Sequence, residues 1–217
     1  MRNKKFLLFF SLLCFNPVMY AQTRVSIETT KGTMVIELYD ETPKHKANFV
    51  KLAKSGFYDS TLFHRVIGDF MIQAGDPESK GAPKGQPLGM GGPGYRVDAE
   101  INNDFIHKKG ALAAARQGDN VNPKRASSGS QFYIVEGKPT SAELLSRFEE
   151  SRGEPYTADQ KKIYETLGGT PHLDGQYTVF GEIVKGLEVV DAISMVKTAR
   201  GDRPVEDIMI VSMKLLD

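Results

Sequence analysis

The 217-residue sequence contains one cysteine, Cys14, and no tryptophan. A single cysteine excludes an intrachain disulfide framework, a zinc site built from several cysteines and a Cys-x-x-Cys redox pair. Neither sign of charge is in excess, because 28 Lys and Arg residues stand against 27 Asp and Glu residues. This balance gives no electrostatic basis for a nucleic-acid partner, and we expect none. With 40% hydrophobic and 25% charged residues, the composition is that of a globular protein.

Long apolar runs are scarce, and the run Phe6–Phe15 covers about half of the roughly 20 residues that cross a bilayer. It follows a basic start and ends before Ala21, which predicts a secretory signal peptide over residues 1–21. The alternatives are an uncleaved anchor or a buried segment. A lipoprotein anchor at Cys14 is disfavoured because both neighbouring residues are bulky. We therefore expect a periplasmic or otherwise exported protein, with no stable membrane insertion once the signal is removed.

Alternation of apolar and polar residues predicts a β-hairpin over residues 25–38. Pro43 then opens a helix that ends before Gly56, and a second short helix is predicted over 187–195. Residues 140–167 are charged and lack a β pattern, which predicts a helical insertion within about 137–169 of a single domain, residues 22–217. Many short strands with few helices favour an antiparallel barrel or sandwich. Further strands are expected near 95–100, 111–115, 131–135, 177–184 and 207–215.

Three sequence patterns suggest other kinds of functional site, but the residues around each pattern do not support that site. Gly89–Gly94 matches the dinucleotide motif GxGxxG, but Pro93 interrupts it and no helix is predicted after it, so it is interpreted as a turn. The four histidines have no spacing typical of metal ligands. Ser128-Gly-Ser130 lacks the strand–turn–helix setting of a hydrolase nucleophile. No cofactor or metal is therefore expected.

The stretch Phe63–Asp76 combines one cation, one amide and two apolar side chains without a general acid or base. Taken alone, it fits a core strand with a surface charge as well as it fits a site. The surrounding sequence, however, resembles the cyclophilin family of peptidyl-prolyl isomerases in six segments that occur in family order. These segments are 42–49, 63–67, 70–76, 91–95, 129–134 and 173–181. The resemblance implies a mostly β fold, a closed eight-stranded antiparallel barrel capped by two helices, with the helical insertion added.

The resemblance also implies a role for each matching residue. Arg65 would be the catalytic guanidinium, and ten residues would bind substrate: Phe70, Met71, Gln73, Ala115, Arg116, Gln131, Tyr133, His172, Leu173 and Tyr177. Four of these depart from common family residues, since Tyr133 replaces Phe, His172 replaces Trp, Tyr177 replaces His and Arg116 replaces Asn. The added hydroxyl of Tyr133 needs a partner if it is buried. These departures are expected to alter the rate and the sequence preference.

The main hypothesis is therefore an exported prolyl isomerase that acts, as a monomer, on proline-containing peptides and on unfolded exported proteins. The alternative is a binding or chaperone module that uses the same groove without turnover. The presence of Arg65, Phe70, Gln73 and Gln131 favours the enzyme. The insertion is expected to be removable without unfolding the barrel, because it lies outside the segments that resemble the family.

Overall fold

The computed structural model describes residues 22–216, so the predicted signal peptide lies outside the described residues. The hairpin forms as expected from β1 (Arg24–Thr29) and β2 (Gly32–Leu38), whose alternate side chains are buried. Gly32 follows the turn with φ of +137°, a value that favours glycine. The hairpin is the starting point of one large antiparallel sheet.

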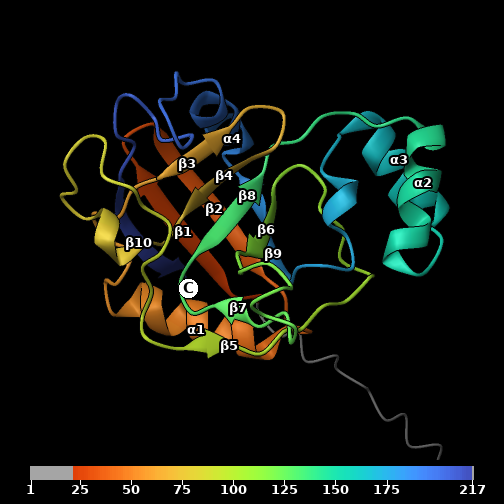
Figure 1. Cartoon of the computed structure of the whole chain (residues 1–217), viewed down its shortest axis with the longest axis horizontal. Coiled ribbons are helices and arrows are strands. Elements are labelled where there is room, and N and C mark those ends of the chain that lie inside the picture. The colour runs from red at the N-terminus through yellow and green to blue at the C-terminus, as the bar shows by residue number, and fades with distance from the viewer. Residues whose placement is uncertain (1–21, 217) are drawn as a thin grey trace, which may run out of the picture.

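Eight strands are hydrogen-bonded in the order β10-β1-β2-β9-β6-β8-β4-β3 (Figure 1). The six strands beyond the hairpin are β3 (Arg65–Ile67), β4 (Met71–Ala74), β6 (Ala111–Ala114), β8 (Phe132–Val135), β9 (Val179–Lys185) and β10 (Ile210–Leu216). A second, two-stranded sheet pairs β5 (Arg96–Val97) with β7 (Ser127–Ser128). Neighbours in the large sheet are antiparallel, as predicted, and the sheet curls around an apolar core.

The expectation of a closed barrel is wrong, because the curled sheet forms a half-barrel. Its end strands, β3 and β10, do not form a ladder with one another, and the isolated bridge between Leu62 and Met209 is the pairing found near that gap. The physical reason is the short length of β3, since three residues that already pair with β4 offer little backbone for a second ladder. A few backbone hydrogen bonds, such as Phe63 N–H to Ile208 C=O at 2.9 Å, bridge the opening instead.

Helices α1 (Pro43–Lys54) and α4 (Leu187–Ser194) lie at opposite ends of the curled sheet (Figure 1). Pro43 occupies the first turn of α1, where its missing N–H is not needed. Both helices place apolar side chains in the central core, including Phe49 from α1 and Val190 from α4. These are the two helices that were expected to cap the sheet.

The strands beneath the site are buried on both faces, because each face carries its own apolar cluster. In β8, Phe132 and Ile134 enter the central core, while Tyr133 and Val135 point to a second cluster on the outer face. Successive residues of a strand point to opposite faces, so one strand supplies both clusters. The outer cluster also contains Met71, and it forms the floor of the candidate site.

The predicted insertion contains α2 (Ala142–Arg152) and α3 (Ala158–Thr166), which lie to one side of the sheet (Figure 1). Ser141 caps α2, and Thr157 forms a reciprocal capping box with Gln160 at the start of α3. The chain then passes through the short 3₁₀ turn η2 (Pro171–Leu173) into β9. A second 3₁₀ turn, η1 (Pro77–Ser79), follows β4. Within residues 22–216 no helix is long and apolar enough to cross a bilayer.

Candidate active site

Strand register places the principal site residues in one row across the outer face of the sheet. Arg65 on β3 pairs with Gln73 on β4, Gln73 pairs with Tyr133 on β8, and Tyr133 pairs with Ala113 on β6. Side chains directly opposite one another in such a ladder lie about 5 Å apart. The row is therefore fixed by backbone hydrogen bonding.

A polar chain runs through this row and holds the guanidinium. Arg65 Nε lies 3.4 Å from Asp202 Oδ2, and Arg65 Nη1 lies 3.5 Å from Gln73 Oε1. Gln73 Nε2 donates to Gln131 Oε1 at 3.1 Å, and Gln131 Nε2 donates to the Gly91 carbonyl at 2.8 Å. The Arg65 side chain remains 41% exposed and lines the adjoining cavity, so N–H groups that these contacts leave unused can donate to a ligand.

A small cavity of about 110 Å³, lined by both polar and apolar side chains, lies beside this polar chain. Nine of the eleven predicted site residues line it, which are Arg65, Phe70, Met71, Gln73, Ala115, Arg116, Tyr133, Leu173 and Tyr177. The cavity thus has aromatic and aliphatic walls and a cationic rim. Such a combination holds a small apolar ring while presenting one hydrogen-bond donor to it.

The remaining two predicted residues, Gln131 and His172, lie next to the cavity. Gln131 lines an adjoining hollow of about 470 Å³ formed largely by residues 89–96. His172 stacks on Phe70, with ring centroids 5.6 Å apart and planes 26° from parallel. Gln131 is therefore placed at the groove, and His172 at the outer edge of the cavity wall.

Arg116 stands where family members often carry Asn, and its side chain is 4% exposed. Its guanidinium packs over the Tyr177 ring at 4.6 Å, and its Nε donates to the Gln176 carbonyl at 2.9 Å. An ion pair with Asp119 fixes the outer end. Arg116 therefore forms a rigid wall of the cavity, and Arg65 is the more available of the two cations.

A larger hollow of about 930 Å³ lies on the other side of Arg65, between residues 84–89 and 199–205. Gln73 and Arg116 line this hollow, the cavity and the hollow beside Gln131. The three spaces thus adjoin around Gln73 and Arg116.

Sequence reasoning missed three residues that support the site. Asp202 pairs with Arg65 from 137 positions away, and His107 and Asp174 lie behind Tyr133. The Tyr133 hydroxyl lies 3.0 Å from His107 Nε2, which gives this buried hydroxyl the partner it needs. The need of the Tyr133 hydroxyl for a hydrogen-bond partner was the one signal in the sequence, but it did not identify His107. Burial also raises the pKa of Tyr133 well above its usual value, so the hydroxyl stays protonated.

Among residues 22–216, no group of three or more His, Cys, Asp or Glu side chains is arranged to hold a metal ion. The site is instead composed of a guanidinium, two amides and apolar rings.

The curled antiparallel sheet carries an exposed guanidinium beside a small cavity with aromatic and aliphatic walls, so the fold and the site define a β-protein with a ligand-binding groove. Comparison with known families identifies it further. The family model described as cyclophilin-type peptidyl-prolyl cis-trans isomerase matches residues 24–215. The chain belongs to this family, as its sequence motifs predicted.

Relatives and solved structures agree with this assignment. The chain is 36% identical over 200 residues to a protein of Staphylococcus haemolyticus whose name assigns it provisionally as a peptidyl-prolyl cis-trans isomerase, covering 90% of this chain and 92% of that one. It is 38% identical over 200 residues to a Streptococcus pyogenes protein provisionally named a bifunctional phosphatase and isomerase, but spans 39% of that protein's length and 89% of its own. A cyclophilin-type isomerase of Cryptosporidium parvum superposes with a TM-score of 0.66 at 26% identity, covering 91% and 99% of the two chains. The same isomerase was also solved in the presence of the dipeptide Ala-Pro, with a TM-score of 0.64, 26% identity and coverage of 89% and 99%.

Proposed function

We propose that this cyclophilin-type isomerase rotates X–Pro bonds at the cavity beside Arg65 and assists the folding of exported proteins. The observation that carries the proposal is the position of an exposed guanidinium beside a small cavity with aromatic and aliphatic walls. Relatives are named for the same reaction, and a structural neighbour was solved in the presence of Ala-Pro.

The reaction requires only a binding site of the right shape and one well-placed hydrogen-bond donor. Rotation about a peptide bond faces a barrier of about 18–20 kcal/mol, because the C–N bond has partial double-bond character. Acceleration by about five decades requires lowering that barrier by only about 7 kcal/mol. No bond is broken, so the enzyme must bind the twisted amide more tightly than the planar one.

In the proposed mechanism the proline ring occupies the cavity against Phe70, Met71 and Tyr133, which line it. Arg65 donates a hydrogen bond to the prolyl nitrogen as this nitrogen becomes pyramidal, which weakens the amide resonance. Gln73 and Gln131 orient the backbone on either side of the ring, from the polar chain that joins them. Arg65 suits this role because arginine stays charged and its planar fork is rigid.

The central prediction concerns Arg65→Ala in an isomerase assay on an Ala-Pro peptide. We expect a folded protein with at least about 100-fold lower activity, since one preorganised donor lowers a barrier by about 2.7–4 kcal/mol. The matched control is Arg147→Ala, which removes an exposed guanidinium of α2 paired only loosely, at 3.8 Å, with Glu143. Near wild-type turnover in Arg65→Ala would remove Arg65 from the mechanism. A wild-type protein that binds the peptide without turnover would instead favour the binding module.

Export and folding assistance rest on the sequence of residues 1–21, with its basic start, short apolar run and Ala21. Expression of the full chain in a bacterium, followed by fractionation and mass measurement, should yield a periplasmic protein that begins at Gln22. An intact chain in the cytosolic fraction would contradict export. The recovered protein should also accelerate the slow, proline-limited refolding phase of an unfolded substrate protein. No change in that phase would contradict the folding role.

A further inference from the structure

A buried carboxylate joins the insertion to the site. Asp174 follows η2 directly and is 2% exposed. Its Oδ1 accepts from the backbone N–H of His107 at 2.8 Å and from His107 Nδ1 at 2.7 Å. Its Oδ2 accepts from the hydroxyls of Tyr164 at 2.6 Å and Tyr156 at 2.8 Å. One carboxylate therefore receives two bonds from the loop before β6 and two from the insertion.

The protonation states of these groups give the chain of hydrogen bonds one direction. Burial alone would raise the pKa of Asp174, but the bonds from His107 and Tyr164 lower it below its usual value, so the carboxylate is ionised. Burial raises the pKa values of Tyr156 and Tyr164, which therefore remain donors. Because an ionised carboxylate can only accept, His107 Nδ1 carries the proton that points to Asp174.

The same chain ends in the substrate cavity. His107 Nδ1 donates to Asp174, and on the other side of the same ring Nε2 lies 3.0 Å from the Tyr133 hydroxyl. The His107 and Tyr133 rings lie nearly parallel, 12° apart, and Tyr177 packs edge-on against Tyr133 at 5.9 Å. Tyr133 therefore has its ring in the cavity and its hydroxyl tied to a network that begins in α3 and in the loop before it.

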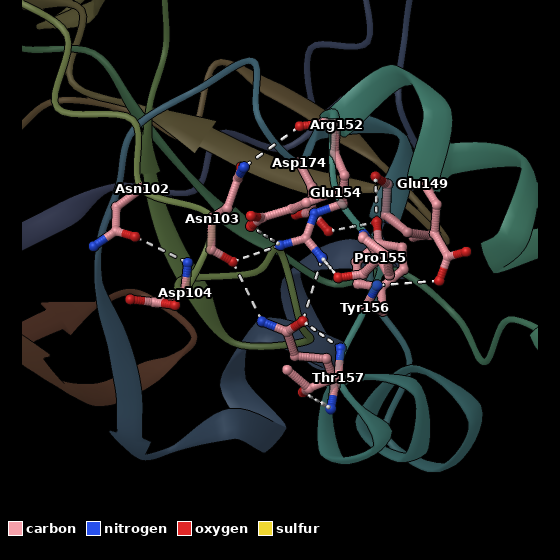
Figure 2. Close-up of polar contacts among 12 residues, drawn as sticks. Asn102, Asn103, Asp104, Glu149, Arg152, Glu154, Pro155, Tyr156, Thr157 and Asp174 are labelled. Carbon is pink, nitrogen blue, oxygen red and sulfur yellow. Dashed lines mark hydrogen bonds and ion pairs between the residues drawn. The ribbon is translucent and has the colours of Figure 1, made fainter.

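The insertion is held firmly enough to transmit this restraint. Arg152, at the end of α2, donates from Nη2 to the Asn103 carbonyl at 2.6 Å and packs over the Tyr156 ring at 4.2 Å (Figure 2). The Asn103 carbonyl also accepts from Gln160 Nε2 at 3.3 Å. An apolar cluster formed by Ile106, Leu145, Tyr156 and Tyr164 fills the space between the insertion and the loop before β6.

We propose that Tyr156, Tyr164 and Asp174 are positioning residues, through which the insertion fixes the Tyr133 wall of the proline cavity. This inference rests on the proposed isomerase function. Without the tyrosine donors, Asp174 keeps a buried charge with half of its hydrogen bonds, and His107 loses a fixed acceptor. The Tyr133 ring then samples more orientations, so the cavity is less well formed for a proline ring.

The primary test is the double variant Tyr156→Phe/Tyr164→Phe, which keeps both rings and removes only the two hydroxyls. We expect a folded protein whose kcat/KM for an Ala-Pro peptide falls about fivefold, within the usual range for coupled residues. Most of the loss should be in KM, because the wall contacts the ring in both the planar and the twisted states. The matched control is Thr157→Ala, which breaks the capping box of α3 and leaves both hydroxyls in place. It should retain full turnover.

A double-mutant cycle with Tyr133→Phe separates positioning from general destabilisation. Tyr133→Phe removes the hydroxyl at the cavity end of the chain, so the two tyrosine changes should then cost less than about twofold in kcat/KM. We expect the buried His107 Nδ1–H, which donates to Asp174, to give an observable proton resonance in NMR spectra of the wild type. This resonance should shift or broaden in Tyr156→Phe/Tyr164→Phe and remain in Thr157→Ala.

Three outcomes would overturn the inference: unchanged kcat/KM in the double tyrosine variant, equal losses with and without the Tyr133 hydroxyl, or an equal loss in Thr157→Ala. Failure of the proposed function is distinguishable from these, because it would show as absent turnover in the wild type or as full turnover in Arg65→Ala.

Discussion

At the scale of single residues, Arg65 meets two requirements that usually conflict. A catalytic donor must be fixed, and it must also be free to reach a ligand. Asp202 and Gln73 hold one side of the guanidinium, while 41% of the side chain stays open to the groove. Arg116 shows the other solution, because its guanidinium is 4% exposed and serves as a wall. Two residues of the same type therefore have different environments at the site.

His172 provides a prediction at the same scale. The family resemblance implies that a Trp at this position donates its indole N–H to cyclosporin-type macrocycles and packs beside them. His172 stacks on Phe70 at the cavity edge and offers a smaller ring. A lost donor–acceptor pair costs about 1–3 kcal/mol, and lost apolar area adds about 25 cal/mol per Å². We therefore expect the macrocycle to inhibit His172→Trp at least about tenfold more strongly than the wild type.

A paired titration of the two proteins in the isomerase assay measures this difference. Turnover of small peptides serves as the control, since it depends more on Arg65 and Gln131 than on position 172. Equal sensitivity of both proteins to the macrocycle would show that position 172 does not face the bound ligand.

At the scale of elements, the insertion lies outside the central core, but its side chains contact residues that lie behind the substrate cavity. The central core cluster contains no residue of 137–169, and changing loop length costs only about 0.6 kcal/mol per doubling. Its helices carry their own caps at Ser141 and Thr157. Yet its tyrosines bind Asp174, and Gly169 forms bridges to Lys108 and Lys138 at its base. Sequence reasoning treated the insertion as an appendage, and these contacts change what its removal should do.

We predict that replacing residues 141–166 with a short Gly/Ser loop leaves a folded barrel with reduced peptide turnover. The barrel should fold because its core is complete, and turnover should fall because Asp174 loses two donors. Circular dichroism with urea unfolding measures the fold, and the Ala-Pro assay measures turnover. An unfolded product would show that the insertion belongs to the core. Full turnover would show that the site does not need it.

At the scale of the whole molecule, buried histidines link stability to pH. Burial lowers the pKa values of His45 and His64 below their usual 6.5. The unfolded chain therefore binds more protons than the folded chain just below pH 6.5, so stability rises with pH there. Glu136 acts in the opposite direction, because burial raises its pKa, but it is one group against two.

We expect the free energy of unfolding to be lower at about pH 5.5 than at about pH 7.5, because His45 and His64 must be protonated against burial in the folded state. Urea unfolding at the two pH values measures the difference. His64→Asn should reduce the pH dependence, since the pKa of His64 is lowered chiefly by burial. Equal stability at both pH values in the wild type would contradict the assignment of buried, neutral histidines.

Much of the molecule could be predicted because its signals are local. Period-two alternation located the hairpin, Pro43 and Gly56 bounded α1, and the composition of 140–167 located the helical insertion. The predicted substrate residues lie together because strand register alone places Arg65, Gln73 and Tyr133 in one row. When sequence motifs occupy neighbouring strands, the pairing of those strands brings the motif side chains together.

Other features were decided only by the tertiary structure, because they depend on how distant segments pack. The opening of the barrel follows from the few residues of β3 that remain to pair with β10. Asp202 reaches Arg65 across 137 positions, and Asp174 reaches His107 across 67. The periodicity of a helix or strand does not predict such pairings. A buried hydroxyl or carboxylate indicates only that it needs a hydrogen-bond partner, not which residue provides it. The packing of the insertion against the loop before β6 determined which residues are the partners of Asp174.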